Sequence, residues 1–210
     1  MNRLVLTADQ IYALAYILKA KYLDYYYISR ANRGNDNKLW LSEITKQLVS
    51  LGILVEDFSG DTTIDPDIET LVKPLYFGSK ESSLDIDMFG DTEDNLGYRF
   101  HFGDGIITMT KTVEDGIEIS EVSFEDIQRI VSKILPANYS AVSETVDIKL
   151  DSSRVTRVFI VKNTDISGKS LVSTLIETDG VVYEENSESE ISSVSSSDFS
   201  DKLYKILTEG

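Results

Sequence analysis

The chain has 210 residues, and its 36 acidic residues outnumber its 20 basic residues, which gives a formal net charge of −16. A surface this acidic repels phosphate backbones and anionic lipids, so neither nucleic acid nor a membrane surface is an expected partner. The absence of cysteine excludes disulfides and thiol chemistry. Because there is also no pattern of a signal peptide and no membrane-length apolar run, we expect a cytoplasmic globular protein.

Two N-terminal helices are predicted from capping residues and helical periodicity. Thr7 and Gln10 have the Thr-x-x-Gln spacing of a capping box, and the apolar pattern continues to about residue 23. A second helix is expected from about Lys38 to Leu51, and Gly52 is a natural left-handed residue to end it. The inward face of this second helix is predicted to carry Leu41, Ile44, Leu48 and Leu51.

A third, shorter helix is predicted around the sequence IDPDIETLVKPL. Asp65 is its expected N-cap, and Pro66 suits the first helical position because no backbone N–H is needed there. Pro74 is expected to end it, since proline removes a donor and clashes with the preceding turn.

From about residue 83 the apolar period changes from roughly 3.6 to 2, which is typical of strands. The expected strands cover 83–89, 97–103, 105–113, 155–163, 171–177 and 181–185, with turns at Gly90, Asp104-Gly105, Asp115-Gly116, Gly168 and Asp179-Gly180. Two helices are also predicted in this strand-rich region. One is capped by Ser123 to Asp126 and closed by Pro136, and the other is capped by Ser195 and Asp198.

A segment near the middle of the chain is repeated at the C-terminus. EISEVSFEDIQRIVSKIL at 118–135 matches EISSVSSSDFSDKLYKIL at 190–207 in 9 of 18 positions, and DGII at 104–107 is echoed by DGVV at 179–182. We interpret this as a repeat of 84–135 in 155–207. The helices and the strands before them should then superpose by a rotation near 180°.

The predicted fold class is therefore α+β. N-terminal helices precede a central antiparallel sheet built from two similar strand-rich halves, each closed by an amphipathic helix, with pseudo-twofold symmetry. We expect residues 1–210 to form a single domain with internal halves of about 1–136 and 137–210.

Residues that could carry catalysis are scarce. His101 is the only histidine, and no Gly-x-Ser-x-Gly motif accompanies it. Two acidic stretches, 57–68 and 85–96, resemble calcium loops but lack the final glutamate of that motif. No phosphate-binding glycine loop is present. We therefore predict no enzymatic activity, no catalytic residues, no metal and no cofactor.

Two further features of the sequence are explained without a specific binding function. The helix and following residues around LVSLGILVEDFSGD resemble part of a winged-helix module, but residues 36–69 hold only Lys38 and Lys46 as cations, which argues against DNA binding. The acidic serine-rich stretch 184–198 is typical of a solvated connection, with partner binding as the alternative.

The order of these elements is similar to that of the EspG family of type VII (ESX) secretion chaperones. That family begins with a Leu-x-x-Glu/Asp…Leu helix, continues with a Leu-x-x-x-Gly-Leu helix end and an Asp-x-Asp-Leu…Leu…Pro helix, and later has a helix ending in Leu-Pro. The corresponding places here are Leu6 to Leu14, Leu48 to Ile53, Asp65 to Pro74 and Leu135-Pro136. The resemblance covers most of residues 4–136.

The resemblance implies a cytoplasmic, non-enzymatic chaperone or adaptor that binds a helical substrate of a type VII secretion system. It further suggests a Firmicutes-type relative with a WXG- or LXG-type helical partner. The low alanine and arginine content departs from the actinobacterial pattern. In the family, binding uses sheet-edge loops and C-terminal helices, but no motif transfers individual contacts to this chain.

Strand alternation alone suggests which residues would meet a partner. Arg99 and His101 share one face of their strand, and the polar sheet face is predicted to include Thr108 and Thr110, so these four are the predicted partner-binding residues. An acidic inhibitor or immunity protein that binds a basic toxin or enzyme is the alternative function, because net charge steers association. A hydrolase with an unrecognised site is a third possibility.

Overall fold

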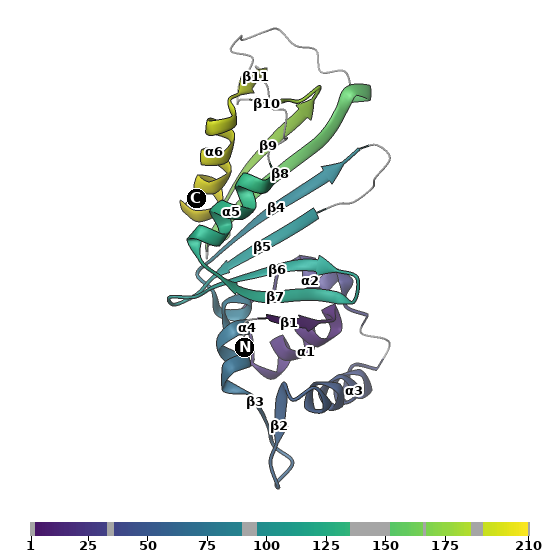
Figure 1. Cartoon of the computed structure of the whole chain (residues 1–210). Coiled ribbons are helices and arrows are strands. Elements are labelled where there is room, and N and C mark those ends of the chain that lie inside the picture. Colours follow the sequence, from purple (N-terminus) through teal and green to yellow (C-terminus); the bar gives the residue numbers. More distant parts are fainter. Residues whose placement is uncertain are drawn as a thin grey trace. The chain divides into compact units, whose positions relative to one another are not determined.

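The computed structural model describes residues 3–32, 36–89, 96–134, 152–165, 167–185 and 191–209 (Figure 1). It is a mixed helix and strand fold with a large antiparallel sheet. The chain divides into two compact units, which we describe in turn. Unit 1 comprises Met1–Ser79 and His101–Glu121, and unit 2 comprises Lys80–Phe100 and Val122–Gly210.

Unit 1 contains four helices and most of the N-terminal strands. The helices are α1 (Ala8–Ile17), α2 (Tyr25–Arg30), α3 (Asn37–Ser50) and α4 (Pro66–Phe77). The strands are β1 (Arg3–Leu6), β2 (Leu54–Glu56), β3 (Thr62–Ile64), β6 (Ile107–Val113), β7 (Gly116–Val122) and the end of β5 (Leu96–Phe102). The sheet order here is β1-β7-β6-β5, while β2 and β3 form a separate antiparallel hairpin.

The core of unit 1 is formed where α1, α3 and α4 bury their apolar faces together with β1 and β7. Its fully buried members include Leu14, Leu48 and Leu75. The buried Tyr76 donates its hydroxyl to the carbonyl oxygen of Ile11 at 2.9 Å. Burial raises the pKa of Tyr76 far above its ordinary value of 10.0, so this hydroxyl stays a hydrogen-bond donor.

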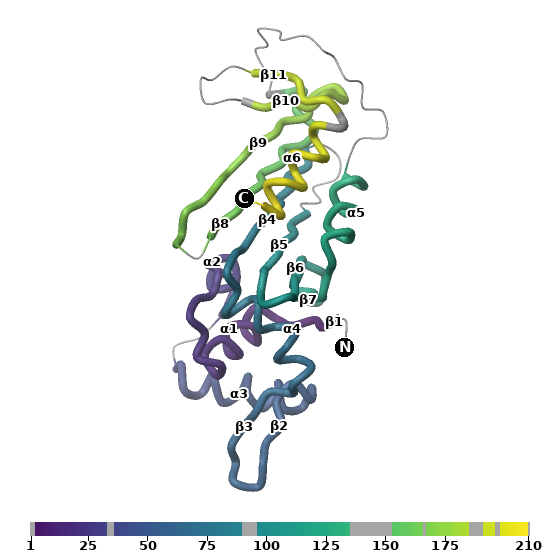
Figure 2. Tube along the Cα trace, turned by 90° about the vertical axis from the view of Figure 1, so that its left-hand side faces the viewer, coloured from purple at the N-terminus to yellow at the C-terminus, as the bar shows by residue number. Residues whose placement is uncertain are grey.

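Unit 2 contains the remaining strands and two helices. They are β4 (Lys80–Met88), the start of β5, α5 (Phe124–Ile134), a 3-10 turn at Ser152–Arg154, β8 (Val155–Asp165), β9 (Ser170–Thr178), β10 (Val181–Glu185), β11 (Ile191–Val194) and α6 (Ser196–Glu209). The sheet order is β5-β4-β8-β9-β10-β11 (Figures 1 and 2).

Helices α5 and α6 lie on the same face of the unit 2 strands. Asn163 Nδ2 and Ser82 Oγ, which are paired residues of β8 and β4, donate to the carbonyl oxygens of Ile206 and Leu207 at 2.7 and 2.8 Å. Lys80 Nζ bonds the next carbonyl of α6, that of Thr208. Side chains of the sheet therefore satisfy carbonyls that have no partner within the last turn of a helix.

The last described residue of α5 is held in a similar way. Arg157 Nη1 donates to the carbonyl oxygen of Ile134 at 2.8 Å, while Arg157 Nε bonds Glu177 Oε2 at 2.5 Å. Asn163 lies six positions after Arg157 on β8, and because side chains alternate along a strand, the two point to the same face of the sheet. Phe159, which lies between them on that face, packs edge to face against Phe199 of α6 with ring centroids 5.1 Å apart.

Most of the predicted helix signals are confirmed. Thr7 and Gln10 form both hydrogen bonds of the capping box at the start of α1. Gly52 follows α3 with a φ of 69°, and Asp65 caps α4 with Pro66 at its start. The Ser123–Asp126 and Ser195–Asp198 pairs begin α5 and α6 through side-chain contacts.

Other expectations about the helices were wrong. Helix α1 ends at Ile17, well before residue 23, and Tyr25–Arg30 forms a separate short helix. Helix α4 continues through Pro74 to Phe77 because burial of Leu75 and Tyr76 offsets the lost backbone hydrogen bond. Leu51 does not join the inward face of α3, since its side chain is 58% exposed.

The expected strands are present, but the periodicity did not predict β1, β7, β11 or the hairpin pair β2 and β3. In the described part of the chain, 80–134 and 155–209 each run through four strands and then a helix. The predicted turn at Gly90 and the predicted helix end at Leu135-Pro136 lie outside the described residues, as does part of the serine-rich stretch. None of the helices described is long and apolar enough to cross a lipid bilayer.

Candidate partner-binding surfaces

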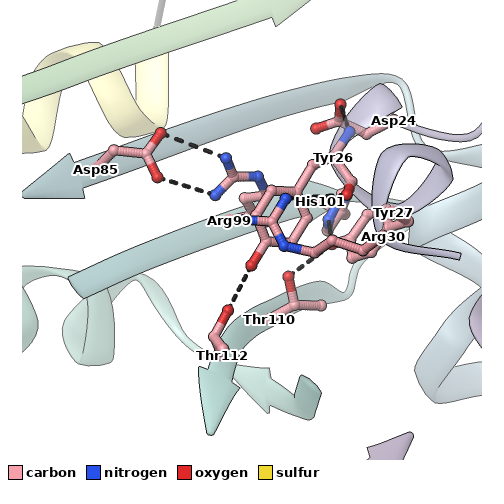
Figure 3. A network of polar contacts seen from close by, with 9 residues as sticks. All are labelled: Asp24, Tyr26, Tyr27, Arg30, Asp85, Arg99, His101, Thr110 and Thr112. Carbon is pink, nitrogen blue, oxygen red and sulfur yellow. Dashed lines mark hydrogen bonds and ion pairs between the residues drawn. The ribbon is translucent and has the colours of Figure 1, made fainter. Parts of the chain in front are cut away.

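Three of the four predicted partner-binding residues are buried inside unit 1. His101, Thr108 and Thr110 are at most 1% exposed. The hydroxyl of Tyr27, on α2, lies 2.9 Å from His101 Nε2 and 2.6 Å from Thr110 Oγ1 (Figure 3). Thr108 Oγ1 donates to the carbonyl oxygen of Leu71, on α4, at 2.7 Å. The expectation that this polar sheet face is open to solvent is therefore wrong.

Helix α2 places Tyr27 over the sheet, and its own contacts explain why it forms. The Asp24 carboxylate caps it by accepting the Tyr26 backbone N–H at 2.9 Å. The Tyr26 hydroxyl lies 2.5 Å from Thr112 Oγ1, and the Arg30 guanidinium sits 3.8 Å from the centroid of the Tyr26 ring. The N-cap residue Asp24 directly before three tyrosines was the available sequence signal for this short helix.

The fourth predicted residue, Arg99, belongs to unit 2. Its guanidinium forms an ion pair with the Asp85 carboxylate, with Nη1–Oδ1 and Nη2–Oδ2 distances of 3.1 and 3.4 Å (Figure 3). The Arg99 side chain is 12% exposed and that of Asp85 is 35% exposed. A direct role for Arg99, His101, Thr108 and Thr110 in partner binding stays a prediction. In the structure Arg99 joins β5 to β4, and the other three contact helices α2 and α4.

Residues 57–61 of the first calcium-like stretch form the turn that joins β2 and β3. In the β2–β3 hairpin, Asp57 Oδ1 accepts hydrogen bonds from the backbone N–H groups of Ser59 and Asp61 at 2.8 and 3.0 Å. The Ser59 hydroxyl also donates to Asp57, and this contact is the main reason why the pKa of Asp57 is lowered. No group of three or more potential metal ligands is found within the described ranges.

Unit 2 has a sheet face that neither α5 nor α6 covers. Both helices bind the face that carries Arg157, Phe159 and Asn163, so the even-numbered residues of β8 point to the other side. The strand registers extend this side across neighbouring strands: Ile160 is paired with Thr174, and Val158 with Ile176, which is paired in turn with Tyr183. We call this surface the open face: Val158, Ile160, Lys162, Val172, Thr174, Ile176 and Tyr183, where Lys162 is paired with Val172.

Apart from the exposed Lys162 and Thr174, the open face is rich in apolar residues for a side of a sheet without a covering helix. Val172 is 55% exposed and Ile160 is 36% exposed, while Val158, Ile176 and Tyr183 are half-buried. Antiparallel sheets with one solvated face normally alternate apolar and polar residues. Residues 158–161, Val-Phe-Ile-Val, do not alternate and instead have the pattern of a strand buried on both sides. Sustained apolar exposure of this kind is typical of an interaction surface.

The open face is large enough for one helix. It spans β8, β9 and β10, and adjacent strands lie about 4.8 Å apart, so the outer two strands are about 10 Å from each other. An α-helix with its side chains is about 10 Å in diameter. Acidic side chains border the surface on β4, where Asp85 is paired with Ile160 and Asp87 with Val158.

Comparison with known proteins identifies a similar fold. No protein-family model matches this chain, and no curated protein matches its sequence. Among solved structures, a similar fold is found in the type VII secretion system chaperone EspG5 of Mycobacterium tuberculosis, determined in complex with a PE25–PPE41 dimer. The TM-score is 0.63 at 9% sequence identity, and the match covers 99% of this chain and 98% of that chain. This similarity confirms an EspG-like fold.

Proposed function

We propose that this protein is a non-enzymatic chaperone or adaptor that binds a helical substrate of a type VII secretion system. The observation that carries the proposal is the apolar open face of unit 2, on a fold shared over nearly its whole length with a chaperone of such a system. A helix packed on this face would remove Ile160 and Val172 from water. Burying apolar area at about 25 cal/mol per Å² is the main source of free energy for such association.

We further propose that the partner is a WXG- or LXG-type helical protein and that this chain is a Firmicutes-type relative of the EspG chaperones. Keeping a small helical protein bound before export would shield the apolar helix surface through which it otherwise aggregates. This role places the protein in the cytoplasm, which agrees with a chain without cysteine.

A matched pair of substitutions on β9 tests the proposal. Val172→Asp places a charge on the open face, whereas Leu171→Asp places the same charge one residue away, on the side that faces α6. The two side chains are similarly exposed, at 55% and 52%. Each variant would be co-expressed with a WXG- or LXG-type protein encoded beside it, and the complex would be measured by size-exclusion chromatography and calorimetry.

We expect Val172→Asp to weaken the complex more than tenfold, because a buried unpaired carboxylate is strongly unfavourable, and Leu171→Asp to change it less than threefold. A photo-crosslinking residue at Ile160 should label one helix of the partner. The proposal fails if no helical secretion substrate binds, or if both substitutions weaken binding equally.

The alternative function, an acidic inhibitor of a basic toxin or enzyme, is favoured by the net charge of −16. Electrostatic steering raises the association rate and is screened by salt, so an inhibitor should associate much more slowly at high ionic strength. Binding through the open face should change little with salt. Stopped-flow association rates at low and at high salt, about 50 and 500 mM, would therefore separate the two functions.

We also propose that 84–135 and 155–207 are related copies with pseudo-twofold symmetry, each closed by its amphipathic helix. Support comes from the shared order of four strands and a helix, and from the Ser-x-x-Asp caps of α5 and α6. In a crystal structure of the protein the two segments should superpose by a rotation near 180°. A superposition that fails to align α5 with α6 would refute the repeat as a structural unit.

A further inference from the structure

A groove in unit 1 lies between α3 and the β2–β3 hairpin and has a volume of about 520 Å³. One face of α3 supplies a wall through Lys38, Leu41, Lys46 and Val49, and the hairpin supplies the opposite wall through Glu56 and Thr62. The buried residues Ile44 and Leu48 of α3 pack into the core of unit 1 and do not line the groove, whereas Leu41 and Val49 are partly buried against that core and also line the groove.

The hairpin wall is formed before any partner arrives. Leu54 and Ile64 are paired on the core side of the hairpin, and the next pair on that side is Glu56 with Thr62, which therefore lines the groove. The turn beyond it is fixed by the Asp57 carboxylate, which accepts three hydrogen bonds from Ser59 and Asp61. A preformed wall reduces the entropy that a partner must lose on binding.

The charge of the groove differs from that of the chain. Lys38 and Lys46 are the only cations between residues 36 and 69, and both line the groove, where Glu56 is the only carboxylate among the described lining residues. Among the ion pairs of the described residues, none involves either lysine or Glu56. On a chain with a net charge of −16, this is a local site for acidic side chains.

The spacing of the lining residues along α3 indicates the form of the ligand. Lys38 and Lys46 are eight residues apart, about 12 Å along the helix axis, and Leu41 and Val49 have the same separation. The wall thus repeats a Lys-x-x-apolar pattern. A helix lying along α3 with carboxylates eight residues apart and apolar residues between them would match both the charges and the apolar positions.

We propose that this groove is a second docking surface, which takes an acidic amphipathic helix of a protein partner. The inference rests on the proposed function for the helical nature of the partner, but it concerns different residues in the other unit. Two carboxylates would meet Lys38 and Lys46, and apolar side chains would cover Leu41 and Val49. Phosphate backbones are disfavoured because the hairpin and the rest of the chain are acidic.

The test uses the full-length protein and two synthetic helical peptides of about 18 residues, roughly five helical turns, held helical by a side-chain lactam. One peptide carries glutamates eight residues apart with leucines between them, and the other carries glutamines in place of the glutamates. Binding is followed by 15N–1H NMR titration. We expect shift changes at residues 38–62, and about five- to tenfold tighter binding of the glutamate peptide, from two exposed ion pairs.

Two variants separate this proposal from a general charge effect. Lys38→Gln combined with Lys46→Gln should abolish the preference for the glutamate peptide, whereas Lys73→Gln, at an exposed position on α4 outside the groove, should retain it. The preference should also fall between about 50 and 300 mM salt. No shift changes at residues 38–62 at millimolar peptide, or equal loss in the Lys73→Gln variant, would overturn the proposal.

The open face provides an independent check. Val172→Asp should leave peptide binding at the groove unchanged, because Val172 lies on β9 of unit 2. Failure of the peptide to bind would thus leave the proposed chaperone function untouched. Conversely, peptide binding would persist if no secretion substrate were found to bind the open face.

Discussion

The side-chain amide of Asn163 on β8 donates a 2.7 Å hydrogen bond to the carbonyl oxygen of Ile206 in the last turn of α6. Asn163 is almost fully buried, and its neighbour across the strands, Ser82, binds the next carbonyl of the same helix. Both polar side chains therefore have a structural role, which is to fix the C-terminal helix on one face of the sheet.

Replacing Asn163 should destabilise unit 2. Asn163→Ala leaves the buried Ile206 carbonyl without this partner, and an unsatisfied buried acceptor costs about 1–3 kcal/mol of unfolding free energy. Urea denaturation followed by circular dichroism measures the change. Thr164→Ala, at the adjacent and more exposed position, is the control and should cost less than about 1 kcal/mol. Equal effects of both substitutions would contradict the role given to Asn163.

The Tyr27 hydroxyl should stabilise unit 1 through its contacts with His101 and Thr110. Tyr27→Phe removes a buried hydroxyl that lies within hydrogen-bond distance of both side chains, and we expect a loss of about 1–3 kcal/mol. Tyr25→Phe, at a largely exposed position on the same helix, should be nearly neutral. Chemical denaturation compares the two. The double variant Tyr27→Phe, Thr110→Val should lose less than the sum of the single changes, since the two residues share a hydrogen bond.

Gly78 should tolerate no side chain. A Cβ atom there would lie 2.4 Å from the Pro74 carbonyl oxygen and 2.9 Å from that of Phe102, both backbone atoms that cannot turn aside. We expect Gly78→Ala to cost about 3 kcal/mol or more, as overpacking does in a well-packed interior. Gly52→Ala meets no atom within 4 Å and is strained only by its φ of 69°, so about 1–2 kcal/mol is expected. Thermal melts should rank the two variants in this order.

The cap of α5 should contribute to acid sensitivity. Hydrogen bonds from the backbone and then from the hydroxyl of Ser123 lower the pKa of Asp126 below its ordinary value of 3.8. A carboxyl with a lowered folded-state pKa stabilises the fold above the unfolded-state pKa, and this contribution disappears as the pH falls through the folded-state pKa. The melting temperature should therefore decline below about pH 4, and less steeply for Asp126→Asn.

The matched change Asp104→Asn, in the turn between β5 and β6, controls for the loss of one negative charge. Melting temperatures between about pH 2 and pH 6 give the comparison, and carboxyl NMR titration of Asp126 reports the pKa directly. An Asp126→Asn curve parallel to that of the unchanged protein would show that this cap plays no part in acid unfolding.

Local signals in the sequence predicted local structure well. Thr7 and Gln10, Asp65 and Pro66, and Gly52 act on backbone groups within a few residues of themselves, so the helix ends they mark can be recognised from the local sequence. Pro74 shows the limit of this reasoning. Pro74 does not end α4, because Leu75 and Tyr76 after it are buried against other elements. That burial cannot be read from the residues next to Pro74.

By itself, the sequence determined the longer strands, most of the helix starts and the alternation of side chains along each strand, because these depend on backbone periodicity and local caps. Only the tertiary structure decided which side of each strand is covered. His101 and Thr110 are polar but lie beneath Tyr27 of α2, whereas Ile160 and Val172 are apolar but lie on the side that α5 and α6 leave open. Helix packing depends on contacts between residues far apart in the sequence. For this reason the candidate binding surface is the one that carries Ile160 and Val172, and not the polar surface that was predicted.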